Sequence, residues 1–261
     1  MIPQRGSMVA AVLSMLAACG VVPKPPADIQ LNRSAVDWNG RRVRIESYLS
    51  HDTSPIVSTV FLLHGIGGIP GDGAMLREVA SALARSGHEA VVVRYFDATG
   101  HWVVSRGVAM RQEPKWRQVL RAVVDAHRAT NPDQKIGILG FSLGGFLSVA
   151  LAAEDLNVDA LAVMSGGVLP EHEDRDFSKL PPVLILHGGR DFLVEPERSA
   201  VLERLATQSG VDVERVIFEN EGHVFRRAAK PRALADIVRF FNSHLQTGQS
   251  ATENVISSQA D

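Results

Sequence analysis

Hydrophobic and polar positions along the chain form two alternating kinds of segment. Continuous apolar runs, such as residues 57–63 and 136–141, are typical of strands buried on both faces of a sheet. Between these runs, apolar residues recur at helical spacing, as in residues 75–86, where Gly87 follows as a natural C-cap. The pattern predicts strands at 42–48, 57–63, 90–95, 136–141, 160–165, 183–186 and 213–218, and helices at 75–86, 113–130, 142–153, 195–209 and 232–245.

The regular order of these elements predicts the fold class. Apolar strands that alternate with helices indicate an α/β domain with a mostly parallel sheet and helices on both faces. No internal repeat or linker divides the body, so we expect a single domain at residues 41–246. The segment between the strands at 160–165 and 183–186 is too short for a large cap domain. The longest irregular stretch, residues 96–112, has the length of a functional loop.

The N-terminal segment has a different pattern. Arg5 precedes an apolar stretch at residues 8–18, which is shorter than the roughly 20 residues needed to span a bilayer and is typical of a secretory signal. Small residues lead to Cys19, and this end resembles the lipobox of bacterial lipoproteins, in which the cysteine is lipidated. We therefore expect a signal peptide at 1–19, lipidation at Cys19 and a Pro-rich tether at 20–40. An ordinary signal peptide, or a true start at Met8, is the alternative.

Charge and cysteine content narrow the classes of partner. The 27 basic and 29 acidic residues give a net charge of -2, which offers no electrostatic footprint for nucleic acid. Cys19 is the only cysteine, so no internal disulfide can form and no thiol catalyst is available elsewhere. A membrane is expected as a partner only through the lipid anchor at Cys19. The anchored protein would lie in the bacterial cell envelope, at the outer membrane or facing the periplasm. Without the anchor, it would be secreted. Residues 247–261 are polar and are expected to be disordered.

One serine carries the strongest chemical signal. Ser142 lies in Gly140-Phe141-Ser142-Leu143-Gly144, between an expected strand and an expected helix, which is the context that a nucleophile-elbow motif requires. A serine hydroxyl is a poor nucleophile at neutral pH and needs a base, an acid to orient that base, and donors for the oxyanion. The N–H of Leu143 at the start of the helix is one candidate donor.

The second oxyanion donor is expected in a loop after an earlier strand. His64-Gly65-Ile66-Gly67-Gly68 follows the strand at 57–63, and the N–H of Ile66 is the best candidate there. A plain glycine-rich turn is the alternative, but the loop lies where a fold with this elbow places its oxyanion hole.

Two further residues complete a triad. Asp191 follows the strand at 183–186, and His223 lies after the strand at 213–218 and before the last helix. The chain order Ser142, Asp191, His223 is that of nucleophile, acid and base in folds with this elbow, and each residue comes after a separate strand. Glu195 is a rival acid, although its place suits a first-turn carboxylate of the following helix. Asp191 could instead cap that helix.

The remaining candidates are weaker. His64 and His187 each begin a His-Gly pair at the end of a strand, and we interpret both as structural. The histidines and carboxylates show no metal-ligand spacing, so we predict no metal and no cofactor. Three residues in or beside the long loop could shape a substrate pocket or serve only in packing: Trp102, Arg106 and Trp116.

Taken together, these motifs resemble the dienelactone hydrolase-like branch of the α/β-hydrolases, from about residue 59 to residue 245. The resemblance rests on the serine motif with its doubled glycine, on the His-Gly-Gly-Arg-Asp motif at 187–191, and on Glu-Gly-His at 221–223. Dienelactone hydrolases proper carry cysteine as nucleophile, where this chain has Ser142. The resemblance therefore implies a carboxylic-ester hydrolase with a small-molecule ester or lactone as substrate.

Three functions remain open at this stage. The leading hypothesis is ester hydrolysis through a covalent acyl-enzyme on Ser142. The same triad could instead cleave a lactone, thioester or peptide bond. A lipid-anchored envelope protein that reuses the fold without catalysis is a third possibility, because fold alone does not fix function.

Overall fold

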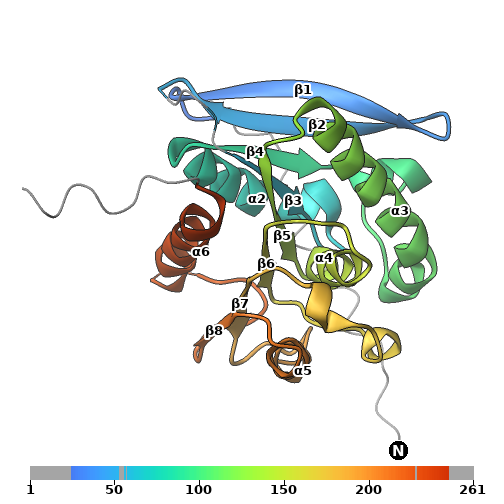
Figure 1. Ribbon diagram of the computed structural model, residues 1–261, viewed down its shortest axis with the longest axis vertical. Coiled ribbons are helices and arrows are strands. Elements are labelled where there is room, and N and C mark those ends of the chain that lie inside the picture. The colour runs from blue at the N-terminus through green and yellow to red at the C-terminus, as the bar shows by residue number, and fades with distance from the viewer. Residues whose placement is uncertain (1–24, 53–55, 57, 227, 247–261) are drawn as a thin grey trace, which may run out of the picture.

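The computed structural model describes residues 25–52, 56, 58–226 and 228–246 (Figure 1). Within them, eight strands form one sheet in the order β1-β2-β4-β3-β5-β6-β7-β8. The strands are β1 (Ile29–Trp38), β2 (Arg41–Ser50), β3 (Ser58–Leu63), β4 (His88–Val93), β5 (Lys135–Phe141), β6 (Ala160–Met164), β7 (Val183–Gly188) and β8 (Val213–Phe218). The helices are α2 (Gly68–Arg85), α3 (Arg106–Thr130), α4 (Leu143–Ala153), α5 (Glu197–Gln208) and α6 (Ala229–Leu245), with short 3-10 turns η1 (Tyr95–Thr99), η2 (Pro170–His172) and η3 (Phe177–Lys179).

Strand pairing confirms the predicted fold class. From β4 to β8 every neighbouring pair is parallel, and only the β1–β2 and β2–β4 pairs are antiparallel. The strands predicted from apolar runs are present, and β8 has the predicted bounds. No large cap domain interrupts the described part of the chain between β6 and β7, which are joined through η2 and η3.

Helices cover both faces of the sheet, as Figure 1 shows. One apolar layer packs α2 and α6 against the sheet and includes Leu76, Leu83, Ile237 and Phe241. The other layer packs α3, α4 and α5 and contains Trp116, a fully buried residue. Burying both faces explains why the parallel strands read as continuous apolar runs.

The strand order reverses direction between β3 and β5. The chain passes from β3 through α2 to β4 on one side, then returns through α3 to β5 on the other side of β3. Leu63 pairs with Gly140 at the carboxyl ends of these two strands. Such a switch point leaves a crevice at the ends of the strands, where ligands bind in open α/β sheets.

Two predicted boundaries are corrected. The tether expected at residues 20–40 overlaps β1, which forms ten register pairs with β2 from Ile29 to Trp38. The fold therefore begins before residue 41; β1 is an edge strand with mostly exposed or half-buried side chains, so it lacks an apolar run. The helix expected at 113–130, with Pro114 in its first turn, begins at Arg106, with Ser105 as N-cap and Pro114 inside. Much of the irregular stretch expected at 96–112 is thus helical.

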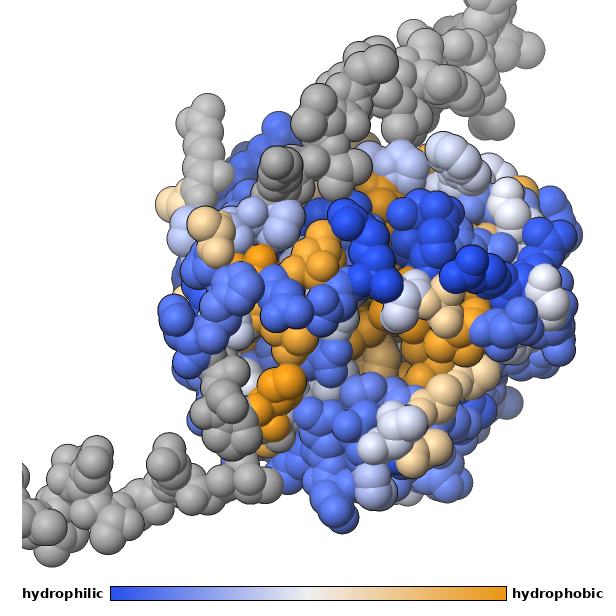
Figure 2. Space-filling model, turned by 90° about the horizontal axis from the view of Figure 1, so that it is seen from above, coloured by the Kyte–Doolittle hydropathy of each residue, from blue (hydrophilic) through white to orange (hydrophobic). Residues whose placement is uncertain are grey.

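The expected signal peptide with Cys19 and the expected tail at 247–261 lie outside the described residues. None of the helices in the described part of the chain is both long and apolar enough to cross a bilayer. Viewed from the side on which β1 lies in Figure 1, the surface is mostly hydrophilic, with apolar groups gathered towards the middle of the face (Figure 2).

Candidate active site

Ser142 occupies a strained turn between β5 and α4. Its backbone has φ 53° and ψ -118°, a conformation that is unfavourable for any residue other than glycine. The turn is fixed from both sides, because the Ser142 N–H donates to Met164 O at 2.9 Å and the Gly145 N–H donates to Ser142 O at 2.9 Å. A Cβ at Gly144 would lie 2.4 Å from Leu63 O, so only glycine allows α4 to approach β3 this closely.

The structure brings the three predicted triad residues together from three strand ends. The His223 Nδ1–H donates to Asp191 Oδ2 at 2.7 Å, and His223 Nε2 accepts from the Ser142 hydroxyl at 2.9 Å. Ser165, just after β6, donates its hydroxyl to His223 O at 2.9 Å and holds the histidine loop. The serine is therefore connected to the carboxylate through one imidazole, the arrangement that activates a serine nucleophile.

Asp191 is buried and receives four hydrogen-bond donors. Besides His223, the N–H groups of Leu193 and Val194 donate to its Oδ1 at 2.9 and 3.0 Å. The fourth donor is His187, whose Nε2 lies 3.2 Å from Asp191 Oδ2 and 3.0 Å from Val194 O. Burial alone would raise the pKa of Asp191, but the hydrogen bonds from His187, His223 and Val194 outweigh it and hold that pKa well below its usual range.

The contact of His187 with the acid was missed in the sequence. The His-Gly pair at the end of a strand predicts a structural role for His187, and its side chain is fully buried. Its Nδ1 has no hydrogen-bond partner among the described residues, so its only polar contacts are made by Nε2. The spacing of four residues between His187 and Asp191 was the available signal.

The loop after β3 lies against the nucleophile. A Cβ built on Gly65 would be 2.9 Å from Ser142 Cβ. Neither the Ile66 N–H nor the Leu143 N–H donates a hydrogen bond to any other described residue, so both are available to an oxyanion. Asp72, at the start of α2, accepts a hydrogen bond from the Gly65 N–H at 2.7 Å and so ties the loop to α2.

Two more contacts hold this loop. The Tyr95 hydroxyl donates to His64 O at 2.6 Å, and the two rings stack with centroids 4.1 Å apart. The Val104 N–H donates to Ile66 O at 3.0 Å. The predicted oxyanion loop is thus held by α2, η1 and the segment before α3. Burial lowers the pKa of His64 to about 4, so this imidazole is neutral at physiological pH.

Asp72 is a carboxyl with a raised pKa that lies against the same loop as the nucleophile. Burial raises its pKa to about 6, although the hydrogen bond from Gly65 and the proximity of His223 pull in the opposite direction. Nothing in the sequence around Asp72 distinguishes it from the other carboxyls, so its contact with the loop could not be predicted.

The remaining sequence candidates lie elsewhere. Glu195 is exposed, and its carbonyl accepts from the Arg198 N–H at the turn into α5. Trp116 is fully buried and donates from Nε1 to the Thr99 hydroxyl at 3.0 Å, so it serves in packing. Trp102 and Arg106 are exposed. No group of His, Cys, Asp and Glu side chains in the described ranges could hold a metal ion.

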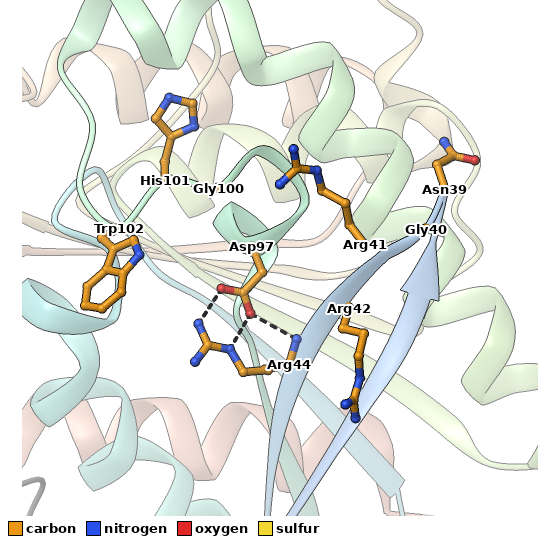
Figure 3. A pocket seen from close by; sticks show the side chains of 9 residues that line it. All are labelled: Asn39, Gly40, Arg41, Arg42, Arg44, Asp97, Gly100, His101 and Trp102. Carbon is orange, nitrogen blue, oxygen red and sulfur yellow. Dashed lines mark hydrogen bonds and ion pairs between the residues drawn. The ribbon is translucent and has the colours of Figure 1, made fainter.

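A cavity of about 570 Å³ adjoins Trp102, whose backbone carbonyl packs against Gly68 at the end of the oxyanion loop (Figure 3). It is framed by the β1–β2 turn and by residues around η1, and its lining includes Arg41, Arg42 and Trp102. Asp97 faces this space and is neutralised by Arg44, whose Nη2 and Nε donate to Oδ1 and Oδ2 at 2.7 and 2.8 Å (Figure 3). The triad residues do not line this cavity, so bond cleavage is not expected to take place in it.

Known proteins resemble the chain over most of its length. The model of the dienelactone hydrolase family matches residues 45–245. A carboxymethylenebutenolidase from Rhodococcus opacus is 27% identical over 216 residues, which cover 74% of this chain and 83% of that protein.

Solved structures share the fold. A dienelactone hydrolase-like promiscuous phosphotriesterase from metagenomic libraries has a TM-score of 0.71 at 20% identity, with 84% of this chain and 99% of that chain covered. The dienelactone hydrolase from Anabaena variabilis has a TM-score of 0.64 at 19% identity, with 84% and 100% covered.

Proposed function

The chain belongs to the dienelactone hydrolase family, and we propose that it hydrolyses carboxylic esters through Ser142, His223 and Asp191. The observation that carries this proposal is the pair of hydrogen bonds that connects the Ser142 hydroxyl to the Asp191 carboxylate through His223. A serine here, where dienelactone hydrolases proper use cysteine, favours esters over the family's dienelactones.

In the first half-reaction His223 Nε2 takes the proton from Ser142 Oγ as that oxygen attacks the ester carbonyl carbon. The negative charge that develops on the carbonyl oxygen is stabilised by the N–H groups of Leu143 and Ile66. His223 then gives its proton to the leaving alcohol, and the acyl group remains on Ser142. In the second half-reaction water attacks this acyl-enzyme by the same proton transfers and releases the acid.

Asp191 supports both half-reactions without changing its own protonation. Its bond to Nδ1 fixes the tautomer of His223 that leaves Nε2 free to accept the serine proton. Because four donors hold its pKa low, Asp191 stays ionised across the pH range in which an esterase works. It therefore stabilises the imidazolium formed in each proton transfer.

The test is Ser142→Ala. We expect kcat for short p-nitrophenyl esters to fall by at least about 10³-fold, since the nucleophile, base and acid act as a unit. A fluorophosphonate probe should label the wild-type protein at Ser142 and leave Ser142→Ala unlabelled. Near-normal hydrolysis by the variant would contradict the assignment. A folded wild-type protein that reacts with no serine-directed probe would support the non-catalytic alternative.

A lactone hydrolase with the same triad is the second candidate. It is favoured by the family and by the name of the Rhodococcus opacus relative. Comparison of kcat/KM across linear esters and lactones of equal carbon number separates the two functions.

We also propose that the protein is attached to the cell envelope by a lipid at Cys19. The support is the apolar segment and small residues that precede this single cysteine. Mass spectrometry of membrane-extracted protein should show a lipidated N-terminal Cys19, and a soluble mature form with an unmodified cysteine would reject the anchor.

A further inference from the structure

Large apolar side chains are exposed at few places in the described part of the chain, and most of these places adjoin the active site. Eight large apolar side chains are exposed there, and six of them are close in sequence to the site. They lie in the oxyanion loop, in the segment 102–104 that packs on it, or just after Asp191 or His223. We call these six residues the apolar rim: Ile66, Trp102, Val103, Phe192, Leu193 and Val224.

One flank of the apolar rim follows the oxyanion loop. Ile66 is itself in that loop, and the backbone of residues 102–104 is packed against it. The Val104 N–H donates to Ile66 O at 3.0 Å, and a Cβ on Gly68 would clash with Trp102 O. The Trp102 side chain is 74% exposed beside this contact.

The other flank follows the acid and the base. Phe192 comes directly after Asp191, and Val224 directly after His223. The Leu193 N–H donates to Asp191 at 2.9 Å, so this turn is anchored on the triad. Phe192 is nevertheless 78% exposed, the largest exposed fraction among the large apolar residues of the described chain.

An apolar surface left in water is unfavourable, and when it is grouped around a functional site it marks a surface that binds an apolar ligand. We propose that the apolar rim binds the hydrocarbon part of the substrate, so that the preferred substrates are esters with apolar acyl chains. This inference rests on the proposed ester hydrolysis and specifies its substrate class.

The requirements of the reaction indicate where such a chain would lie. The carbonyl carbon must contact Ser142 Oγ while its oxygen lies at the Ile66 and Leu143 N–H groups. We expect the substituents of that carbon to contact the apolar rim, because its residues adjoin these reacting groups along the chain. The charged cavity of Figure 3 is lined by Arg41, Arg42 and Arg44 and by none of the triad residues, and its arginines favour no neutral hydrocarbon.

The test compares acyl chain lengths with one leaving group. For wild-type protein we expect kcat/KM to rise by at least about tenfold from p-nitrophenyl acetate to p-nitrophenyl hexanoate. Four added methylenes that were fully buried would each contribute about fourfold, and partial burial on an open rim contributes about twofold each. Both esters are used below the concentration at which they aggregate.

The double variant Trp102→Ser, Phe192→Ser removes the most exposed side chain of each flank. We expect its hexanoate-to-acetate ratio of kcat/KM to fall to about threefold or less. Because the readout is a ratio within one protein, a loss of folded material cancels. The matched control is Ile56→Ser, an exposed apolar residue just before the amino end of β3, whereas the triad lies at the carboxyl ends of the strands; its ratio should equal that of the wild type.

Two results would overturn the proposal: a flat wild-type ratio, or a ratio that the double variant leaves unchanged. In the second case, light scattering that shows a wild-type dimer dissociated by the double variant would assign the apolar rim to self-association instead. In each of these cases hydrolysis of the acetate ester and probe labelling of Ser142 still report on the proposed function separately. If neither ester is hydrolysed and the probe labels nothing, ester hydrolysis itself fails.

Discussion

At the residue scale, the carboxylate of Asp191 is held by more donors than a catalytic acid needs. Two backbone N–H groups satisfy Oδ1, and two histidines share Oδ2. Only His223 of these four donors takes part in the proton transfers. The other three fix the direction of the carboxylate, which determines where the imidazole of His223 points.

The side chain of His187 tests this interpretation. In His187→Leu, Asp191 loses one hydrogen-bond donor. A hydrogen bond to a charged group contributes about 1.5–3 kcal/mol, so we expect kcat to fall by about 10- to 100-fold. KM should change little, because His187 is buried behind the acid and does not reach the substrate.

His187→Gln is the control, because its amide can still donate towards Asp191, and it should retain more of the activity. Circular dichroism checks that both variants fold. Equal kcat for the leucine variant and the wild type would show that His187 serves in packing alone.

Asp72 leads to a prediction on the pH dependence of stability. Its folded-state pKa of about 6 lies above the usual aspartate value of 3.8, so the neutral carboxyl favours the folded protein at low pH. This contribution is lost as the pH rises from about 4 through about 6. Asp72→Asn cannot ionise, yet its amide oxygen can still accept from the Gly65 N–H.

We therefore expect the Tm of Asp72→Asn, relative to wild type, to increase between pH 4 and pH 6 and to stay level above pH 6.5. Thermal unfolding of both proteins in the same buffers measures the difference. A difference that is constant across this range would mean that Asp72 ionises as an exposed carboxyl does.

At the scale of elements, the active site depends on how closely α4 packs on β3. Two glycines give a matched pair for this contact. Alanine at Gly144 would place its Cβ 2.4 Å from Leu63 O, whereas a Cβ at Gly71, in α2, meets nothing within 4 Å. The two substitutions add the same methyl group to helices on either side of the nucleophile.

We expect Gly144→Ala to lower the free energy of unfolding by about 1–3 kcal/mol, because α4 must shift away from β3. Gly71→Ala should raise it by up to about 1 kcal/mol through helix propensity alone. Urea unfolding of both variants measures the two changes. If Gly144→Ala were as stable as wild type, the close approach of α4 would be contradicted.

Elements were predictable where burial dictates the pattern. Strands β3 and β5 are covered on both faces, so their residues are apolar throughout and were recognised. The first two turns of α3 were missed because Pro114 was read as a first-turn proline. It lies inside the helix instead, with Met110, four residues earlier, exposed at its surface.

The active-site residues were predictable where their place in the chain fixes their place in the fold. Ser142, Asp191 and His223 could be placed because each follows a strand, and parallel strands end at one edge. The roles of His187 and Asp72 could not be found in this way. Both depend on contacts with buried partners that only the folded backbone brings together.

At the scale of the whole molecule, β1 closes one edge of the sheet. It covers β2 over ten register pairs and carries charged side chains such as Arg33 and Asp37, which discourage pairing with a second sheet. A chain shortened to begin at residue 41, the boundary predicted from the sequence, would expose the edge of β2 and the buried side chains of Val43 and Tyr48.

We expect this shortened chain to have a lower Tm and to form oligomers in analytical ultracentrifugation. A chain that begins at residue 25 retains β1 and is the matched control. Monomeric behaviour of the shorter chain, with unchanged Tm, would show that the sheet needs no such cover.

The strained backbone of Ser142 has a consequence for laboratory evolution. A non-glycine residue held at φ 53° and ψ -118° costs the folded state about 1–3 kcal/mol. Ser142→Gly relieves that cost and abolishes the nucleophile, so the inactive protein should be the more heat-resistant one. A library screened for thermal survival alone will therefore enrich chains that have lost their chemistry, and selection must require turnover and survival in the same round.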